Sequence, residues 1–169
     1  TNVYPLPLHH PLDVANMTST IDHLSAGRFI LGAAVGSSAR DFAVFKVPFE
    51  KRGRIIEEQI KVMKALWTQE EVTFKGKYFD LESISLAAPR PIQKPHPPIW
   101  LGITKTFRRV ARYASGFNIS GAWGDGQSFR DALQVIHAEA RKIGRDPSQI
   151  SASVMATMVV RNDDSEAQT

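Results

Sequence analysis

The sequence predicts an α/β protein in which about five parallel strands alternate with helices. Residues 28–35 form an apolar run next to Gly27, which indicates a buried strand, and residues 52–68 carry apolar side chains at helical spacing. A strand–helix order recurs five times and is interrupted by one hairpin, and such alternation requires right-handed crossovers. Two architectures fit: an open doubly wound sheet, or part of a (β/α)₈ barrel, since a complete barrel takes about 250 residues.

The first half of the chain has clear start and stop signals. Pro5 and Pro7 exclude a helix at the beginning, Pro11 suits the first position of a helix, and Gly27 suits the residue after its end. The elements expected here are an extended segment at 1–8, a helix at 12–24, a buried strand at 28–35, a short helical turn at 41–45 and a helix at 52–68.

The second half is divided by a proline-rich connector, residues 88–98, whose five prolines favour an extended chain. Thr104 or Thr106 can cap the helix after it, and Ser128 can cap a later helix. The elements expected are a hairpin at 72–81, a strand at 99–102, a helix to about 114, a strand at 116–120, a loop at 121–127, a helix at 128–143, a strand at 150–161 and a helix start at 162–164.

Composition narrows the class of protein. Hydrophobic residues make up 43% and charged residues 22%, which is typical of a globular protein, and no apolar run approaches the ~20 residues that span a bilayer. The absence of cysteine excludes disulfides and thiolate metal sites, and it fits a cytoplasmic location. The net charge is +4, but the basic residues are scattered. We therefore expect a solvated surface, with no nucleic-acid and no membrane partner.

The turn after the strand at 28–35 is the main candidate for chemistry. Gly36 and Ser37 follow the strand directly, and unpaired amides at such a turn can hold a phosphate. No nucleophile elbow, Walker-type loop or histidine pair with metal-ligand spacing occurs. Asp22, Glu57 and Glu58 lie on expected helices, where solvation or ion pairing is a simpler explanation than catalysis. The sequence thus indicates binding of a phosphorylated small molecule.

Four segments together carry a family resemblance. They are PLPLHHPLDVANMTSTIDHLSAGRFILGAAVG (5–36), DFAVFKVPFEKRGRIIEEQIKVMKALWTQ (41–69), VTFKGKYFDL (72–81) and PRPIQKPHPPIWLG (89–102). In this combination the chain resembles the bacterial luciferase-like flavin monooxygenases. The resemblance implies a partial TIM barrel and a single domain over residues 1–169. On this resemblance, the chain would run from the third barrel strand to the seventh and would lack the first two barrel units and the last.

The resemblance also implies chemistry. Members use reduced FMN with molecular oxygen to oxidise a small organic substrate, and a sister branch uses a deazaflavin for hydride transfer. Two alternatives stay open: a non-catalytic remnant that keeps flavin binding or dimerisation, and an independent flavodoxin-like binding module. Open strand edges in an incomplete barrel favour association, so we expect a homo-oligomer.

Candidate site residues follow from the family positions. His10, at the top of a strand, is the candidate catalytic residue. The candidate cofactor-binding residues lie at three strand ends: Asn2, Val3, Gly36, Ser37, Thr104, Lys105 and Thr106. The chain departs from the family at Val35, where luciferase-type relatives carry Arg, and at Gly102-Ile103-Thr104, where many carry Gly-Gly-Ser.

Overall fold

A computed structural model describes residues 3–102, 107–120 and 126–155 of the chain. The predictions for Asn2, for Thr104, Lys105 and Thr106, and for a helix start at 162–164 lie outside the described residues.

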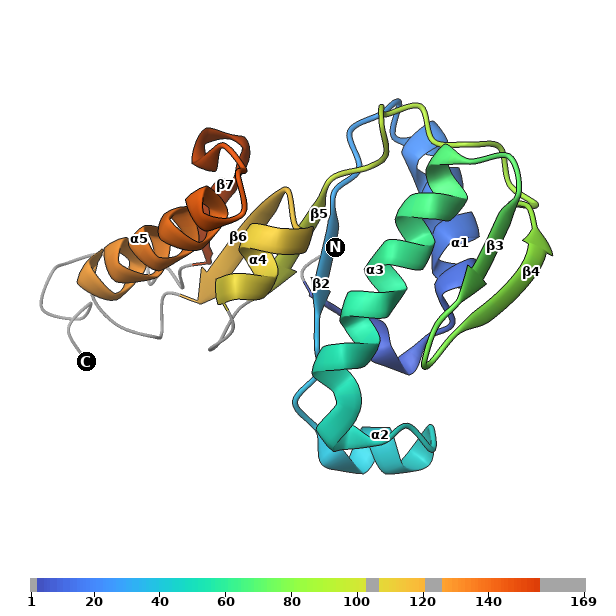
Figure 1. Ribbon diagram of the computed structural model, residues 1–169, viewed down its shortest axis with the longest axis horizontal. Helices are drawn as coiled ribbons and strands as arrows, with labels where there is room; N and C mark the ends of the chain where they lie inside the picture. Colours follow the sequence, from blue (N-terminus) through green and yellow to red (C-terminus); the bar gives the residue numbers. More distant parts are fainter. Residues whose placement is uncertain (1–2, 103–106, 121–125, 156–169) are drawn as a thin grey trace, which may run out of the picture.

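Five parallel strands form one sheet (Figure 1). They are β1 (Tyr4–Pro5), β2 (Leu31–Ala34), β5 (Ile99–Gly102), β6 (Gly116–Ser120) and β7 (Ser151–Met155). Their order in the sheet is their order along the chain, and every neighbouring pair is parallel. In a doubly wound sheet the strand order reverses at a switch point, so that later strands are added on the other side of the first strand. In a barrel each new strand is added next to the preceding one. The order confirms the partial barrel and contradicts the doubly wound sheet and the flavodoxin-like module.

Helices connect successive strands, and a hairpin is inserted before β5. The helices are α1 (Pro11–Leu24), α2 (Ala39–Val44), α3 (Arg52–Thr68), α4 (Phe107–Tyr113) and α5 (Gly126–Lys142). The hairpin pairs β3 (Val72–Lys75) with β4 (Asp80–Ile84) in antiparallel register, and it lies beside α1 and α3 (Figure 1). Short 3₁₀ turns occur at Leu6–Leu8, Phe49–Lys51 and Pro147–Gln149.

The predicted bounds hold for α3, β5 and β6. Parts of the predicted loop at 121–127 and of the predicted strand at 150–161 lie outside the described residues, and the other bounds differ. The extended prediction is wrong at Leu6–Leu8, where the His9 amide donates to the Leu6 carbonyl 3.0 Å away and closes a 3₁₀ turn. The buried strand is shorter than predicted, since β2 covers only Leu31–Ala34. Helix α5 begins at Gly126 rather than after a Ser128 cap. Side-chain bonds of Gln127 to Asp131 and Arg130 stabilise this earlier first turn.

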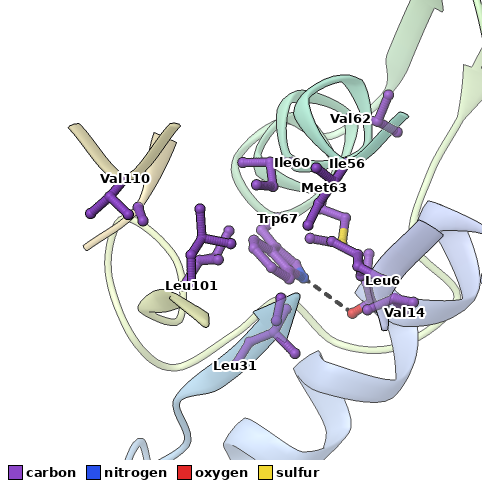
Figure 2. Close-up of a cluster of buried hydrophobic side chains, with 14 of the residues drawn as sticks. Leu6, Val14, Leu31, Ile56, Ile60, Val62, Met63, Trp67, Leu101 and Val110 are labelled. Atoms are coloured by element: carbon purple, nitrogen blue, oxygen red, sulfur yellow. Dashed lines mark hydrogen bonds between the residues drawn. The ribbon is translucent and has the colours of Figure 1, made fainter. Parts of the chain in front are cut away.

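The hydrophobic core lies between the sheet and the helices. Alternate strand residues such as Leu31, Leu101 and Phe117 are buried on the helix-facing side. Trp67 of α3 is 1% exposed in the centre of this cluster, and its Nε1–H donates to the Ala15 carbonyl 3.1 Å away (Figure 2). This bond satisfies the indole donor, so a large aromatic ring joins α1, α3 and the sheet without leaving a polar group unpaired.

The opposite face of the sheet carries several small or polar residues together with the ring of Trp100. Gly32, Gly102, Asn118 and Ser153 occupy strand positions that alternate with the core residues. Successive strand residues point to opposite faces, so the pattern that buries one face leaves the other, apart from Trp100 and Met155, with little side-chain bulk. This face and the strand ends are where a ligand can enter.

A buried carboxylate joins α1 to the connector. Asp22 is 0% exposed; its two oxygens accept from the Gln93 amide at 2.9 Å and from Gln93 Nε2 at 2.6 Å. The same Nε2 donates to the Phe29 carbonyl at 2.8 Å. The expectation of a solvated or ion-paired Asp22 is therefore wrong, whereas Glu57 pairs with Arg109 at 3.0 Å as expected.

Asp22→Ala is expected to lower the free energy of unfolding by about 3 kcal/mol, because it leaves two buried donors of Gln93 without their acceptor. Urea unfolding followed by tryptophan fluorescence measures this change. Asp13→Ala, at an exposed position of the same helix, is the control and should cost less than about 1 kcal/mol. Equal losses in the two variants would contradict the role of Asp22.

Glu58 of α3 holds the hairpin turn. Its carboxylate accepts from the amides of Lys77 at 3.0 Å, Tyr78 at 2.7 Å and Phe79 at 2.8 Å. Burial alone would raise the pKa of Glu58, but these three hydrogen bonds and the nearby Lys61 hold it below its usual value. The charged form thus stabilises the folded hairpin.

Because the folded-state pKa of Glu58 is depressed, its contribution is present above the unfolded pKa of about 4.3 and is lost as the pH falls through the folded value. Glu58→Gln is expected to flatten the fall in stability between about pH 5 and pH 3, by at most about 1 kcal/mol for this solvent-screened group. Thermal unfolding across this pH range is the measurement. Glu82→Gln, an exposed change on the same hairpin, should leave the pH dependence unchanged.

Candidate cofactor site

The carboxyl ends of the strands surround a cavity of about 540 Å³, here called the rim cavity. Strand residues Pro5, Ala34, Gly102 and Met155 contribute to its wall. In a sheet with barrel winding these ends all lie on one edge, which is where (β/α)₈ enzymes place their active sites. The volume is in the range of ordinary small-molecule pockets.

The turn after β2 forms one side of the rim cavity. Gly36 has a φ of +80°, and a Cβ at this position would lie 2.7 Å from Cε2 of Phe42. Only glycine fits this conformation and this close approach. The Ser38 hydroxyl accepts from the Asp41 amide at 3.2 Å and caps α2. Ser37 is exposed, and within the described residues its hydroxyl has no hydrogen-bond partner, so it can serve a ligand.

Arg52, the first residue of α3, also lines the rim cavity. Its Nη1 donates to the Phe49 carbonyl at 2.8 Å, and its guanidinium carbon lies 3.7 Å from the Phe49 ring centroid. The Nε atom is buried and has no hydrogen-bond partner among the residues that the structure describes. Sequence reasoning missed Arg52, because the sequence shows it only as one of several scattered basic residues at a helix start.

A second cavity of about 240 Å³ adjoins the first along the uncovered face of the sheet. Val3, Gly102 and Asn118 line both cavities. Asn118 Nδ2 donates to Ser153 Oγ at 2.9 Å, and this hydroxyl donates to the Phe117 carbonyl at 3.3 Å. Small residues, a fixed amide and the larger side chains of Ile30 and Trp100 therefore line a wall against which a flat ring could lie.

His10 lies apart from these two cavities. Its Nδ1 accepts from the Leu12 amide at 3.2 Å and caps α1, and its ring meets the Phe79 ring edge-on at 5.7 Å. It lines a third cavity, of about 560 Å³, with Tyr4, His9 and Asp13. The structure thus shows a capping role for His10, and its catalytic role stays a prediction.

His9 is the histidine next to His10, with a different environment. Its ring stacks on Tyr4 with centroids 4.2 Å apart, and burial lowers the pKa of the imidazole. The buried Gln59 of α3 fixes the backbone here, because its Nε2 donates to the carbonyls of Leu6 at 2.9 Å and His9 at 2.6 Å. The backbone at His9 is therefore fixed by Gln59, and burial of the imidazole favours its neutral form.

The structure brings three of the predicted cofactor-binding residues together, since Val3, Gly36 and Ser37 all line the rim cavity. Gly102, the residue before the segment 103–106, lines the same cavity. Among the described residues, no group of three or more acidic or histidine side chains could hold a metal ion. None of the described helices is both long and apolar enough to cross a bilayer.

The family profile of the luciferase-like monooxygenases matches residues 1–169, so the chain belongs to this family. The crystal structure of a monooxygenase from Streptomyces bottropensis superposes with a TM-score of 0.85 at 22% identity, covering 99% of this chain and 51% of that one. The fold is therefore that of luciferase-like TIM-barrel proteins over about half their length.

Three curated relatives show the range of the family. An uncharacterised protein of Mycobacterium tuberculosis is 36% identical over 116 residues, or 66% of this chain and 40% of that protein. The FMNH2-dependent dimethylsulfone monooxygenase of Pseudomonas putida is 26% identical over 170 residues, which cover 90% of this chain and 46% of that protein. The F420-dependent glucose-6-phosphate dehydrogenase of Amycolatopsis mediterranei is 31% identical over 121 residues, which cover 70% of this chain and 33% of that protein. The chain thus spans less than half the length of these relatives.

Gly36→Ala is expected to lower the free energy of unfolding by about 2–4 kcal/mol, because it adds a clash with Phe42 to the strain of a positive φ. Gly144 provides a matched control, since its φ is +72° and nothing lies within 4 Å of a Cβ placed there. Gly144→Ala should cost only about 1 kcal/mol. Chemical denaturation of both variants gives the difference, and equal losses would contradict the close packing at Gly36.

Proposed function

We propose that this chain forms part of the cofactor site of a flavin-dependent oxidoreductase that uses reduced FMN and oxygen to oxidise a small organic substrate. The rim cavity carries the proposal. It combines a polar end, with the Ser37 hydroxyl and Arg52, and a wall of low bulk at Gly102 and Asn118. These two ends suit a molecule with an anionic tail and a flat ring.

In this proposal the phosphate of FMN lies at Gly36, Ser37 and Arg52, and the ring lies against Val3 and Gly102. The buried, unpartnered Nε of Arg52 is the feature of the chain that fits an anion. The flavin supplies the redox chemistry when bound, and the chain's own residues bind it, orient it and exclude water from the wall. Asn2, Thr104, Lys105 and Thr106 stay predicted cofactor contacts, and His10 stays the predicted catalytic residue.

A deazaflavin-dependent hydride transfer is the second candidate, since relatives of both kinds match the chain. Both cofactors carry a flat tricyclic ring and a phosphate, so the rim cavity suits either. A non-catalytic, flavin-binding or dimerising remnant is the third. The single domain that lacks the flanking barrel units, the homo-oligomer and the cytoplasmic location stay predictions.

We expect the 169-residue chain to bind FMN with a Kd in the micromolar range, because the proposed ring wall and the proposed anion contact both lie within the described residues. Titration of oxidised and of reduced FMN, and of the deazaflavin in parallel, measures this by fluorescence. Tighter binding of the deazaflavin would favour hydride transfer. If neither cofactor binds at concentrations up to about 1 mM, a Kd that corresponds to a binding free energy of roughly −4 kcal/mol, the proposed function is contradicted.

A further inference from the structure

We propose that His96 makes the junction between the connector, α3 and α4 sensitive to acid, so that protonation of its ring loosens the connector from α3. The neutral ring packs against Trp67, whereas the charged ring would join two cations that already lie at the end of α4. The inference is independent of the proposed function. It concerns the starts of the strands, at the opposite end of the sheet from the rim cavity.

The ring of His96 joins the connector to the hydrophobic core. Its centroid lies 5.6 Å from that of Trp67, with an angle of 33° between the two planes. Trp67 is itself fixed by its bond to the Ala15 carbonyl (Figure 2). His96 Nδ1 lies 2.8 Å from the Pro97 carbonyl oxygen, and because a carbonyl only accepts, Nδ1 carries the proton of the neutral ring.

Two cations hold the end of α4 beside this ring. Lys64 of α3 donates from Nζ to the Tyr113 carbonyl at 2.9 Å, and Arg145, after α5, donates from Nη1 to the Ala111 carbonyl at 2.9 Å. Carbonyls of the last helical turn favour cations. Neither cation makes a salt bridge within the described part of the chain. The three side chains Lys64, His96 and Arg145, here called the basic junction, therefore carry a surplus of positive charge.

Burial and charge both act against protonation of His96. Burial lowers the pKa of His96 and the charge of Lys64 lowers it further, although the bond to the Pro97 carbonyl raises it. Burial and the charge of Arg145 lower the pKa of Lys64 in the same way. The basic junction is thus a place where one more positive charge is disfavoured.

The other charged groups on the elements around the basic junction are engaged elsewhere. On α3, Lys61 lies over the Tyr113 ring at 5.8 Å, and Glu57 is paired with a cation of α4. In the connector, Lys94 donates to a carbonyl three positions back. After α5, Asp146 uses both carboxylate oxygens on the residue two positions on. None of these groups is placed to neutralise a charged His96.

The competing explanation is that Trp67 stabilises the charged ring, since a cation near an indole face is attracted to it. The two explanations predict opposite signs. Attraction by Trp67 would raise the pKa of His96 and strengthen the junction in acid. Burial and repulsion lower this pKa, so that acid weakens the junction.

The direction of the pH dependence follows from the lowered pKa. An unfolded chain titrates its histidines at about pH 6.5, so it binds more protons than the folded chain in this range. The stabilisation by neutral His96 is present above the unfolded pKa and is lost as the pH falls through the folded value. His9, whose pKa burial also lowers, contributes in the same direction and needs a separate variant.

The first test is urea unfolding of the 169-residue chain at about pH 7.5 and about pH 5, on either side of the histidine range. Between these values the unfolding equilibrium constant of the wild type should rise by at least about threefold more than that of His96→Gln. In a His9→Gln background, His96→Gln should give the same difference, because the two sites contribute separately.

The second test is proton NMR of the His96 ring in the folded chain. We expect its titration midpoint to lie below that of an unstructured histidine. Lys64→Gln keeps a donor for the Tyr113 carbonyl but removes the charge, so it should move the midpoint upward. The matched control is Lys61→Gln, which removes an exposed charge one turn earlier on the same helix and should leave the midpoint unchanged.

Hydrogen exchange locates the loosening. The Leu31 amide donates to the carbonyl of Pro98, the last residue of the connector, at 2.9 Å. Its protection factor should fall by at least about threefold between pH 7.5 and pH 5 in the wild type and stay constant in His96→Gln.

Three results would overturn the inference. One is a His96 midpoint at or above that of an unstructured histidine. Another is an equal dependence of stability on pH in the wild type and in His96→Gln. The third is an unchanged midpoint in Lys64→Gln, because the basic junction would then have no part in the effect. None of these results depends on whether the chain binds a flavin.

Discussion

The arrangement of this protein depends on one constraint: parallel strands that are hydrogen-bonded in the order in which the chain makes them. Each crossover returns the chain to the same edge of the sheet, so every strand ends on the same side. The turn after β2, the end of β5 and the end of β7 are far apart in sequence, yet they line one cavity for this reason.

The same winding gives the two faces of the sheet different roles. Helices α1, α3 and α4 cover the face that carries Leu31, Leu101 and Phe117, and Trp67 fills the space between them (Figure 2). The other face carries Trp100 and otherwise small or polar strand residues such as Gly32, Gly102 and Asn118, which in a barrel would face the interior. Two buried polar side chains tie connecting segments to the helices. Asp22 of α1 bonds to Gln93 in the connector before β5, and Gln59 of α3 bonds to the turn after β1.

Sequence reasoning was most accurate where local signals were strong. Helix α3 was predicted to the residue because its apolar side chains repeat at helical spacing, and the turn at Gly36 and Ser37 was placed correctly at the end of a strand. It failed where a distant contact decides. Asp22 resembles a surface acid in the sequence, but Gln93, seventy-one positions later, makes it a buried acceptor. In the sequence Arg52 is one basic residue among several at a helix start. Only the structure shows that it lies over the Phe49 ring and lines the rim cavity.

The sequence by itself determined the family, the alternation of strands and helices, and the turn that favours phosphate. Those features depend on neighbouring residues, whose periodicity and turn preferences can be read along the chain. Only the tertiary structure decided that the sheet winds as a barrel, that the cavity beside His10 is separate from the rim cavity, and that Arg52 shares a cavity with Ser37. These features depend on contacts between residues that are distant along the chain, and a linear sequence does not show which of its many possible distant pairs folding brings together.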